Sequence, residues 1–151
     1  GAGANFALAC DIILAVEHAS FIQAFSAIGL IPDSGGTYTL PRSIGMAKAT
    51  ALAMLGDKVS AEEAERIGMI YKYFSADTFE EEVNKIAVKL SKMPTKGLGL
   101  TKLALNQSLK NSFEQQMLLE TDLQLKAAST EDYNEGVAAF VAKRKPDFKG
   151  K

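Results

Sequence analysis

The sequence predicts an α/β domain over residues 1–94, followed by a helical region over residues 95–151. Two observations lead to this division. Before Pro94, short apolar runs suited to strands alternate with helical patterns, as is typical of α/β domains. After Pro94, the apolar residues recur almost wholly at helical spacing.

The first elements follow from apolar runs and from their interruptions. Residues 6–15 are expected to begin as a helical turn and to continue as a strand, and residues 19–25 read as a second short strand. Residues 37–55 have a helical pattern that is expected to break near Pro41 and Gly45. The apolar positions available for one face of this segment are Leu40, Ile44, Ala47, Ala51 and Leu55.

Later helices are marked by their starts. Ser60 and Glu63 form a capping-box pattern, which predicts a helix that ends near Gly68, and residues 70–74 then read as a strand. Further starts are predicted at Thr78 and at Ser112, and a last helix is expected over about residues 131–142. Apolar residues repeat along these three helices at Val83, Ile86, Ala87 and Leu90, at Leu118, Leu119, Leu123 and Leu125, and at Tyr133, Val137, Phe140 and Val141.

Composition limits the classes of function. The chain has 151 residues, 47% of them hydrophobic, and a net charge of −1, so it can bury a core and offers no electrostatic case for nucleic acid or membranes. A single cysteine and a single histidine make a metal site unexpected, and Cys10 is expected to be a small buried residue. We therefore expect a cytoplasmic protein with no metal.

Residues 31–37 hold the first catalytic candidate. Asp33 lies between Pro32 and the glycine pair Gly35 and Gly36, directly before a helical segment. Proline fixes the approach of the chain and glycine lets backbone pass close to a ligand, so this loop suits a catalytic carboxylate. The alternative is that Asp33 is only a turn residue or a helix N-cap.

Residues 1–5 hold the second candidate. A glycine-rich turn that opens a helix leaves backbone N–H groups without partners, and such groups can bind a developing oxyanion. The alternative is a plain helix start.

In their order and spacing, several segments together resemble the crotonase, or enoyl-CoA hydratase/isomerase, superfamily. The segments are residues 1–5, 10–13, 19–21, 28–37, 55–64, 67–70 and 140–146. The resemblance covers the whole chain and implies the C-terminal part of a crotonase-type ββα spiral core over residues 1–94. It also implies that residues 95–151 form a helical region that builds trimers and covers the active site. Because family members carry a further segment before the glycine turn, we expect a piece of a longer protein.

The resemblance also implies the chemistry. The substrate would be an acyl-CoA thioester, with no separate cofactor because coenzyme A is part of that substrate, and the assembly would be a homotrimer or a dimer of trimers. Family hydratases use two glutamates, and the corresponding positions hold Asn5 and Phe25, neither of which can transfer a proton. Asp33 lies where some family isomerases carry their acid/base. By position in the family motif, the backbone N–H of Ala2, or in second place that of Gly3, would be an oxyanion donor.

The segments around these positions particularly resemble the ring-epoxide isomerases of phenylacetate breakdown. We therefore expect an acyl-CoA isomerase, in which Asn5 orients the substrate or Asp33. Phe25, Ile28 and Leu30 would shape an apolar acyl pocket. The alternatives are an enoyl-CoA hydratase and, from another class, a non-catalytic RNA-binding relative.

The basic tail is open to two interpretations. Residues 143–151 have the composition of a solvated end. The resemblance implies instead that Phe148 and a lysine such as Lys145 contact the adenine or the phosphates of coenzyme A.

Overall fold

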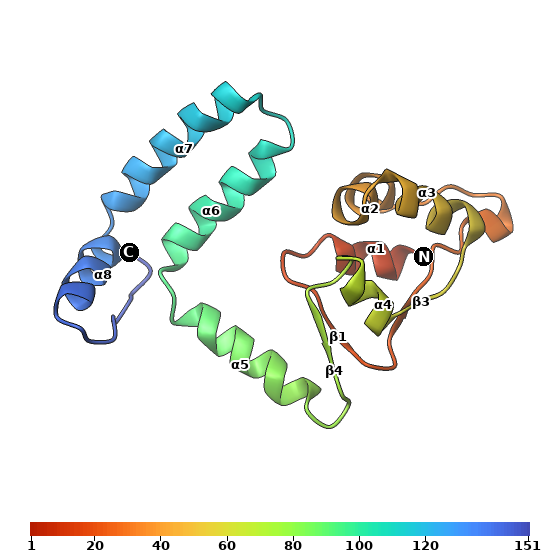
Figure 1. Ribbon diagram of the computed structural model, residues 1–151, viewed down its shortest axis with the longest axis horizontal. Coiled ribbons are helices and arrows are strands. Elements are labelled where there is room, and N and C mark those ends of the chain that lie inside the picture. The colour runs from red at the N-terminus through yellow and green to blue at the C-terminus, as the bar shows by residue number, and fades with distance from the viewer. The chain divides into compact units, whose positions relative to one another are not determined.

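The computed structural model describes residues 1–151 as a mixed α/β chain that is mostly helical. The chain forms two compact units, residues 1–84 and residues 85–151 (Figure 1). The boundary between them falls within helix α5 (Phe79–Ser91). The division predicted at residue 94 rests on the apolar pattern rather than on contacts, and it stays a prediction.

The first unit contains two small sheets. Strand β1 (Leu14–Val16) pairs in parallel with β4 (Lys72–Phe74), and Leu14 lies opposite Lys72. Strand β2 (Ser20–Phe21) pairs antiparallel with β3 (Val59–Ser60). Both pairings join residues about 40 to 60 positions apart in sequence, so they tie the start of the chain to the segment around helix α4 (Ala61–Arg66).

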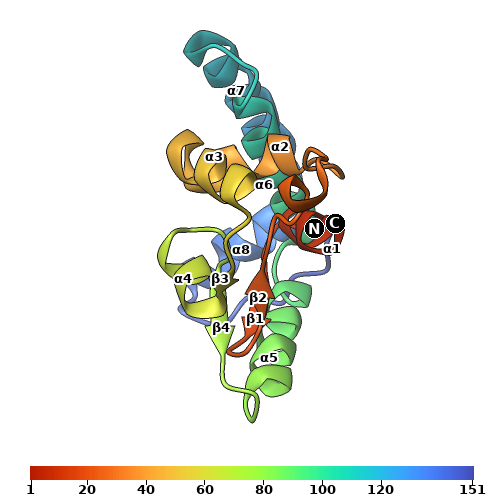
Figure 2. The same cartoon turned by 90° about the vertical axis from the view of Figure 1, so that its right-hand side faces the viewer.

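Helices pack around these strands. Helix α1 (Ala2–Leu8) packs on α2 (Gly36–Ile44), which in turn packs on α3 (Met46–Leu55), and these three lie together in Figure 2. A short 3₁₀ turn, η1 (Ser26–Ile28), follows β2. The core of the unit is apolar and comprises Leu8, Ala15, Phe21, Leu40, Ala49, Val59, Ala61, Ala64, Met69 and Ile70.

Four predictions for this unit need correction. The helical segment breaks at Gly45, as expected, but Pro41 lies inside α2 and does not end it. Because the chain turns at Gly45, with φ of 79°, the predicted face is not continuous, and Ala47, Ala51 and Leu55 are exposed. The second strand is only Ser20–Phe21 rather than residues 19–25, and Cys10 is exposed rather than buried.

The predicted helix starts are confirmed. The hydroxyl of Ser60 accepts from the N–H of Glu63, 3.2 Å away, although the Glu63 carboxylate binds Arg66 and Lys48 rather than closing a capping box. Ser112 and Gln115 form the complete capping box of helix α7 (Phe113–Ala128).

The second unit is helical. Helix α6 (Thr95–Ser108) and α7 form an antiparallel hairpin, and α8 (Glu131–Val141) packs against α7 (Figure 1). Leu123, on α7, is buried in this unit. None of the helices of the chain combines the length and the hydropathy needed to cross a lipid bilayer.

Candidate functional site

The segment around Asp33 forms a tight turn at the start of α2. The N–H of Gly36 donates to the carbonyl of Asp33 at 2.8 Å, which closes a turn over residues 33–36. Both central residues have positive φ, 50° at Ser34 and 78° at Gly35, as in a type I′ turn. A serine in the left-handed region is uncommon, so this turn holds local backbone strain of the kind that functional sites often carry.

The carboxylate of Asp33 is presented to solvent by this turn. Asp33 is exposed, and the hydroxyl of Ser34 donates to its Oδ1 at 2.9 Å. The carboxylate precedes the N-terminus of α2, where the helix dipole favours negative charge. A fixed backbone and an accessible carboxylate are what a general acid or base requires.

Asn5 holds the backbone of the same turn from the inside. Its side chain is fully buried, and its Nδ2 donates to the carbonyl of Asp33 at 2.9 Å. Its Oδ1 accepts a hydrogen bond of 2.6 Å from Nε2 of Gln23, which is also buried. Asn5 and Asp33, which sequence analysis placed in one site, are therefore in direct contact, through the backbone of Asp33 rather than its carboxylate.

The glycine turn forms the start of α1. Gly1 provides no side chain to cap this helix, and the first intrahelical acceptor, the carbonyl of Gly1, bonds to the N–H groups of Ala4 and Asn5. The N–H groups of Ala2 and Gly3 precede those bonds, so the helix itself offers them no partner. Both are available in principle to an oxygen outside the helix.

The apolar residues expected to line a pocket have different exposures. Phe25 is 9% exposed, and its carbonyl accepts from the N–H groups of Ile28 and Leu30. Ile28 and Leu30 are 73% and 59% exposed. The segment that leads to Asp33 therefore displays uncovered apolar surface, whereas Phe25 is part of the packed interior.

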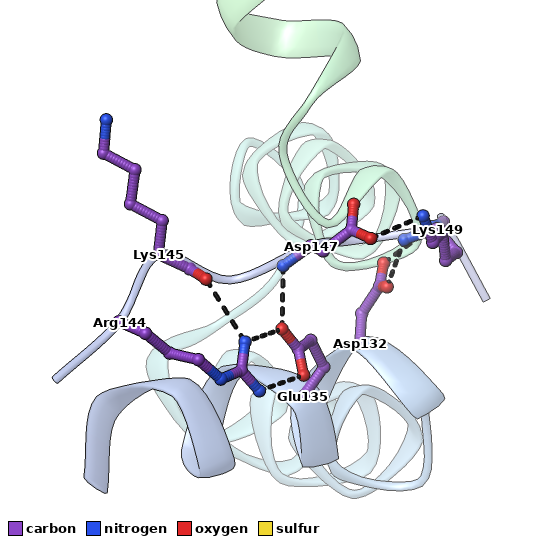
Figure 3. A network of polar contacts seen from close by, with 7 residues as sticks. Asp132, Glu135, Arg144, Lys145, Asp147 and Lys149 are labelled. Atoms are coloured by element: carbon purple, nitrogen blue, oxygen red, sulfur yellow. Dashed lines mark hydrogen bonds and ion pairs between the residues drawn. The ribbon is translucent and has the colours of Figure 1, made fainter. Parts of the chain in front are cut away.

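The tail belongs to the second unit and is clamped onto α8. The guanidinium of Arg144 binds the carboxylate of Glu135 through two hydrogen bonds, of 2.6 and 2.7 Å, and the N–H of Asp147 also donates to Glu135 (Figure 3). Chiefly because of Arg144, the pKa of Glu135 falls from 4.5 to about 2. The carboxylate of the buried Asp132 accepts hydrogen bonds from the N–H groups of Lys149 and Gly150, at 2.6 and 2.8 Å.

The two tail residues predicted to bind coenzyme A differ in their surroundings. Phe148 lines an apolar groove of about 390 Å³ together with Tyr133, Val137 and Phe140. Lys145 is exposed, and its side chain extends away from the Glu135 network in Figure 3. The part of the basic tail from Arg144 to Gly150 is held on the second unit by these hydrogen bonds, and most of its residues are exposed.

Sequence analysis gave no role to two residues that contact the turn. Gln23 is buried on Asn5, and Ser34 binds the Asp33 carboxylate. Gly36 was singled out as one of the glycine pair, and it leaves the space that the Asn5 amide fills. The Gln23 contact joins residues 18 positions apart and has no local signature.

Comparison with known proteins gives one consistent result. The family model described as enoyl-CoA hydratase/isomerase matches residues 1–151. The chain is 48% identical to the 1,2-epoxyphenylacetyl-CoA isomerase of Escherichia coli, over 100% of the chain and 58% of that protein. It is 35% identical to the 2,3-dehydroadipyl-CoA hydratase of the same organism, over 100% of the chain and 59% of that protein.

Solved structures give the same family. A crystal structure of an enoyl-CoA hydratase from Polaromonas matches with a TM-score of 0.93 and 34% identity, over 99% of this chain and 58% of that one. The crotonase fold inferred from the sequence is thereby confirmed for this part of the fold. The chain spans less than two thirds of the length of the relatives it matches, and these relatives include both an isomerase and hydratases.

Proposed function

Because the chain belongs to the enoyl-CoA hydratase/isomerase family, we propose that the whole protein isomerises an acyl-CoA thioester, with Asp33 as its single acid/base. The substrate class follows from the family. The choice of isomerisation over hydration follows from the residues of this chain. The 48% identity to an epoxyphenylacetyl-CoA isomerase supports the same choice.

The chemistry requires one base and one oxyanion site. The carboxylate of Asp33 removes a proton from the carbon next to the thioester carbonyl, and the electron pair passes to the carbonyl oxygen as an enolate. The N–H of Ala2, or less favourably that of Gly3, stabilises this oxygen. Asp33 then returns the same proton to a different carbon, which shifts the double bond with no net gain or loss of atoms. The alternative to a shift of the double bond is the opening of a ring epoxide through the same enolate.

One observation carries the proposal: an exposed carboxylate lies on a turn whose backbone is held by a fully buried amide. An amide donates to the Asp33 carbonyl, which a carboxylate at position 5 would repel. Residue 5 therefore supports Asp33 and does not transfer protons. The alternative role for Asn5, orientation of the substrate, is less favoured because its two polar atoms are engaged by Asp33 and Gln23.

Hydration is the less favoured reaction. Hydration needs a second acid/base that activates the attacking water or delivers a proton to the substrate. The positions that hold the two glutamates in family hydratases carry the amide of Asn5 and the buried phenyl ring of Phe25 here. The similarity to hydratases keeps this reaction as the competing hypothesis to be measured.

The test uses the full-length protein and the variant Asp33→Asn. The amide keeps the shape of the side chain and cannot accept the proton, so turnover of a 3-enoyl-CoA or an epoxy-acyl-CoA should fall by at least ~100-fold. The matched control is Asp147→Asn on the exposed tail, which makes the same chemical change away from the proposed base. It should leave turnover close to that of the parent.

Three outcomes distinguish the hypotheses. Near-normal isomerisation by Asp33→Asn would contradict the role of Asp33. Hydration of 2-enoyl-CoA by the parent at a rate above its isomerisation would favour the hydratase. Retention of RNA in a gel-shift assay, with neither activity, would favour the non-catalytic relative.

A further inference from the structure

Asn5 and Gln23 are the buried polar side chains of the first unit, and they bind each other. The orientation of both amides is set by the carbonyl of Asp33. A carbonyl only accepts, so Asn5 presents its Nδ2 to Asp33 and its Oδ1 to Gln23. Gln23 must therefore donate from Nε2 to Asn5, and a directed chain of hydrogen bonds runs from Gln23 through Asn5 to Asp33.

This arrangement leaves a polar atom without a partner. Oε1 of Gln23 is buried and accepts no hydrogen bond. An unpaired buried oxygen opposes folding, and an apolar side chain of similar size would avoid it. Gln23 is thus poorly explained by stability, whereas its Nε2 has a definite partner at 2.6 Å.

Asn5 has little freedom to compensate for a change at Gln23. It is 0% exposed, and a methyl group built on Gly36 would lie 2.4 Å from its Nδ2. If the Asn5 amide turned over, its oxygen would face the carbonyl oxygen of Asp33. Donation from Gln23 to Oδ1 therefore favours the orientation of Asn5 in which Nδ2 faces the carbonyl of Asp33.

We propose that Gln23 is a positioning residue for Asp33 that acts through Asn5. Its Nε2 fixes the orientation of the Asn5 amide, and Asn5 holds the Asp33 carbonyl and with it the turn that presents the carboxylate. The inference rests on the proposed role of Asp33 as the acid/base. It adds a residue that never contacts the reacting atoms.

The decisive variant is Gln23→Glu in the full-length protein, because it replaces one NH₂ group by oxygen. The new carboxylate cannot donate to Asn5. Either its oxygen faces Oδ1 of Asn5, or the Asn5 amide turns over and its Oδ1 faces the carbonyl oxygen of Asp33; both arrangements are repulsive. We expect kcat to fall by about 10- to 100-fold, with KM changed less than about 2-fold. Gln116→Glu is the matched control, since Gln116 donates to the carbonyl of Ala104 in the other unit.

The pH dependence separates positioning from a general loss of structure. A protonated carboxyl regains one O–H donor, and burial raises the pKa of such a group. The ratio of kcat in Gln23→Glu to kcat in the parent should therefore rise as the pH falls. Asp33 is present in both proteins, and the ratio compares them at the same pH.

A second variant covers the possibility of misfolding. Gln23→Met removes the donor and the unpaired oxygen together, so the variant should fold and still lose about 10-fold in kcat, with a ratio to the parent that does not change with pH. Parent-like kcat in both variants, or a pH-independent ratio for Gln23→Glu, would overturn the proposal.

A double variant separates this proposal from the proposed function. If Gln23 acts through Asp33, adding Gln23→Glu to Asp33→Asn should cause no further loss of kcat. A further loss of the same size as in the parent would overturn the positioning role while leaving Asp33 as the base. Near-normal turnover in Asp33→Asn alone would instead show that the proposed function is wrong.

Discussion

Gly36 leaves the space that the side-chain amide of Asn5 occupies. A methyl group built on Gly36 would lie 2.4 Å from Nδ2, 2.6 Å from Cγ and 2.7 Å from Oδ1 of Asn5. Gly36 has an ordinary φ, so its role is close approach and not backbone freedom. The N–H of Gly36 also closes the Asp33 turn, so this glycine affects both the packing of Asn5 and the conformation of the turn.

Gly36→Ala should therefore destabilise the protein by about 1–3 kcal/mol, because the buried Asn5 has no room to retreat. Urea unfolding of the full-length protein measures the change. The control is Gly99→Ala on α6, where nothing lies within 4 Å of the added methyl group. That change should be neutral or stabilising by up to ~1 kcal/mol, so equal effects of the two substitutions would contradict the packing argument.

Ser34 allows backbone strain and hydrogen bonding to be tested separately. Its φ of 50° is unfavourable for a side chain, and its hydroxyl binds Asp33 at 2.9 Å. Ser34→Ala and Ser34→Gly both remove the hydroxyl, so both should lower turnover by a similar factor. Only glycine relieves the strain, so Ser34→Gly should be more stable than Ser34→Ala by about 1 kcal/mol. Equal unfolding midpoints would show that the turn is unstrained.

The difference between local and distant signals explains what the sequence could predict. The starts of α4 and α7 were predicted because Ser60 and Ser112 act on residues three positions away. Helix α6 was not predicted individually, because Gly97 and Gly99 lower its helix propensity and Pro94 provides no side-chain cap.

The candidate site divides in the same way. Asp33 and the glycine turn were found from local sequence and from the family resemblance. The chain of hydrogen bonds from Gln23 to Asn5 depends on how α1 and the segment after β2 pack, which a single sequence does not reveal. Pro41 was wrongly expected to end a helix because the rule against interior proline is a preference that tertiary packing overrides.

The clamp between Glu135 and Arg144 predicts a pH-dependent contribution to stability. The pKa of Glu135 is lowered from 4.5 to about 2 in the folded protein, so its stabilising effect is complete above 4.5 and is lost as the pH falls toward 2. The difference in unfolding free energy between the parent and Glu135→Gln should shrink over this window. The exposed Asp147 offers a control, because Asp147→Asn should give no measurable difference at any pH.

Restoring the two hydratase glutamates should change the reaction. Asn5→Glu together with Phe25→Glu is expected to raise 2-enoyl-CoA hydration above the parent's rate, since two carboxylates can then place and activate a water. Isomerisation should fall in the same variant, because a carboxylate at position 5 repels the carbonyl of Asp33. Loss of the absorbance of the conjugated thioester measures hydration. Strong hydration by the parent itself would contradict the isomerase assignment.

The leucines of α7 lie on two different faces of the helix. Leu118 and Leu125 are seven residues apart and share one stripe of the helix, whereas Leu123 lies about 140° from Leu118 around the axis. Leu123 is 6% exposed, but Leu118 and Leu125 are 74% and 68% exposed, so one apolar face is covered within the unit and the other is not.

We propose that another subunit covers the exposed face, with an intrachain partner in the longer protein as the alternative. Light scattering of the full-length protein should give a trimer or a multiple of it, and Leu118→Glu with Leu125→Glu should shift the protein to smaller species. Gln124→Glu, on the same helix, adds charge at an exposed polar position and should leave the mass unchanged. A folded, active monomer of the parent at low concentration would contradict the subunit contact and leave the intrachain partner as the explanation.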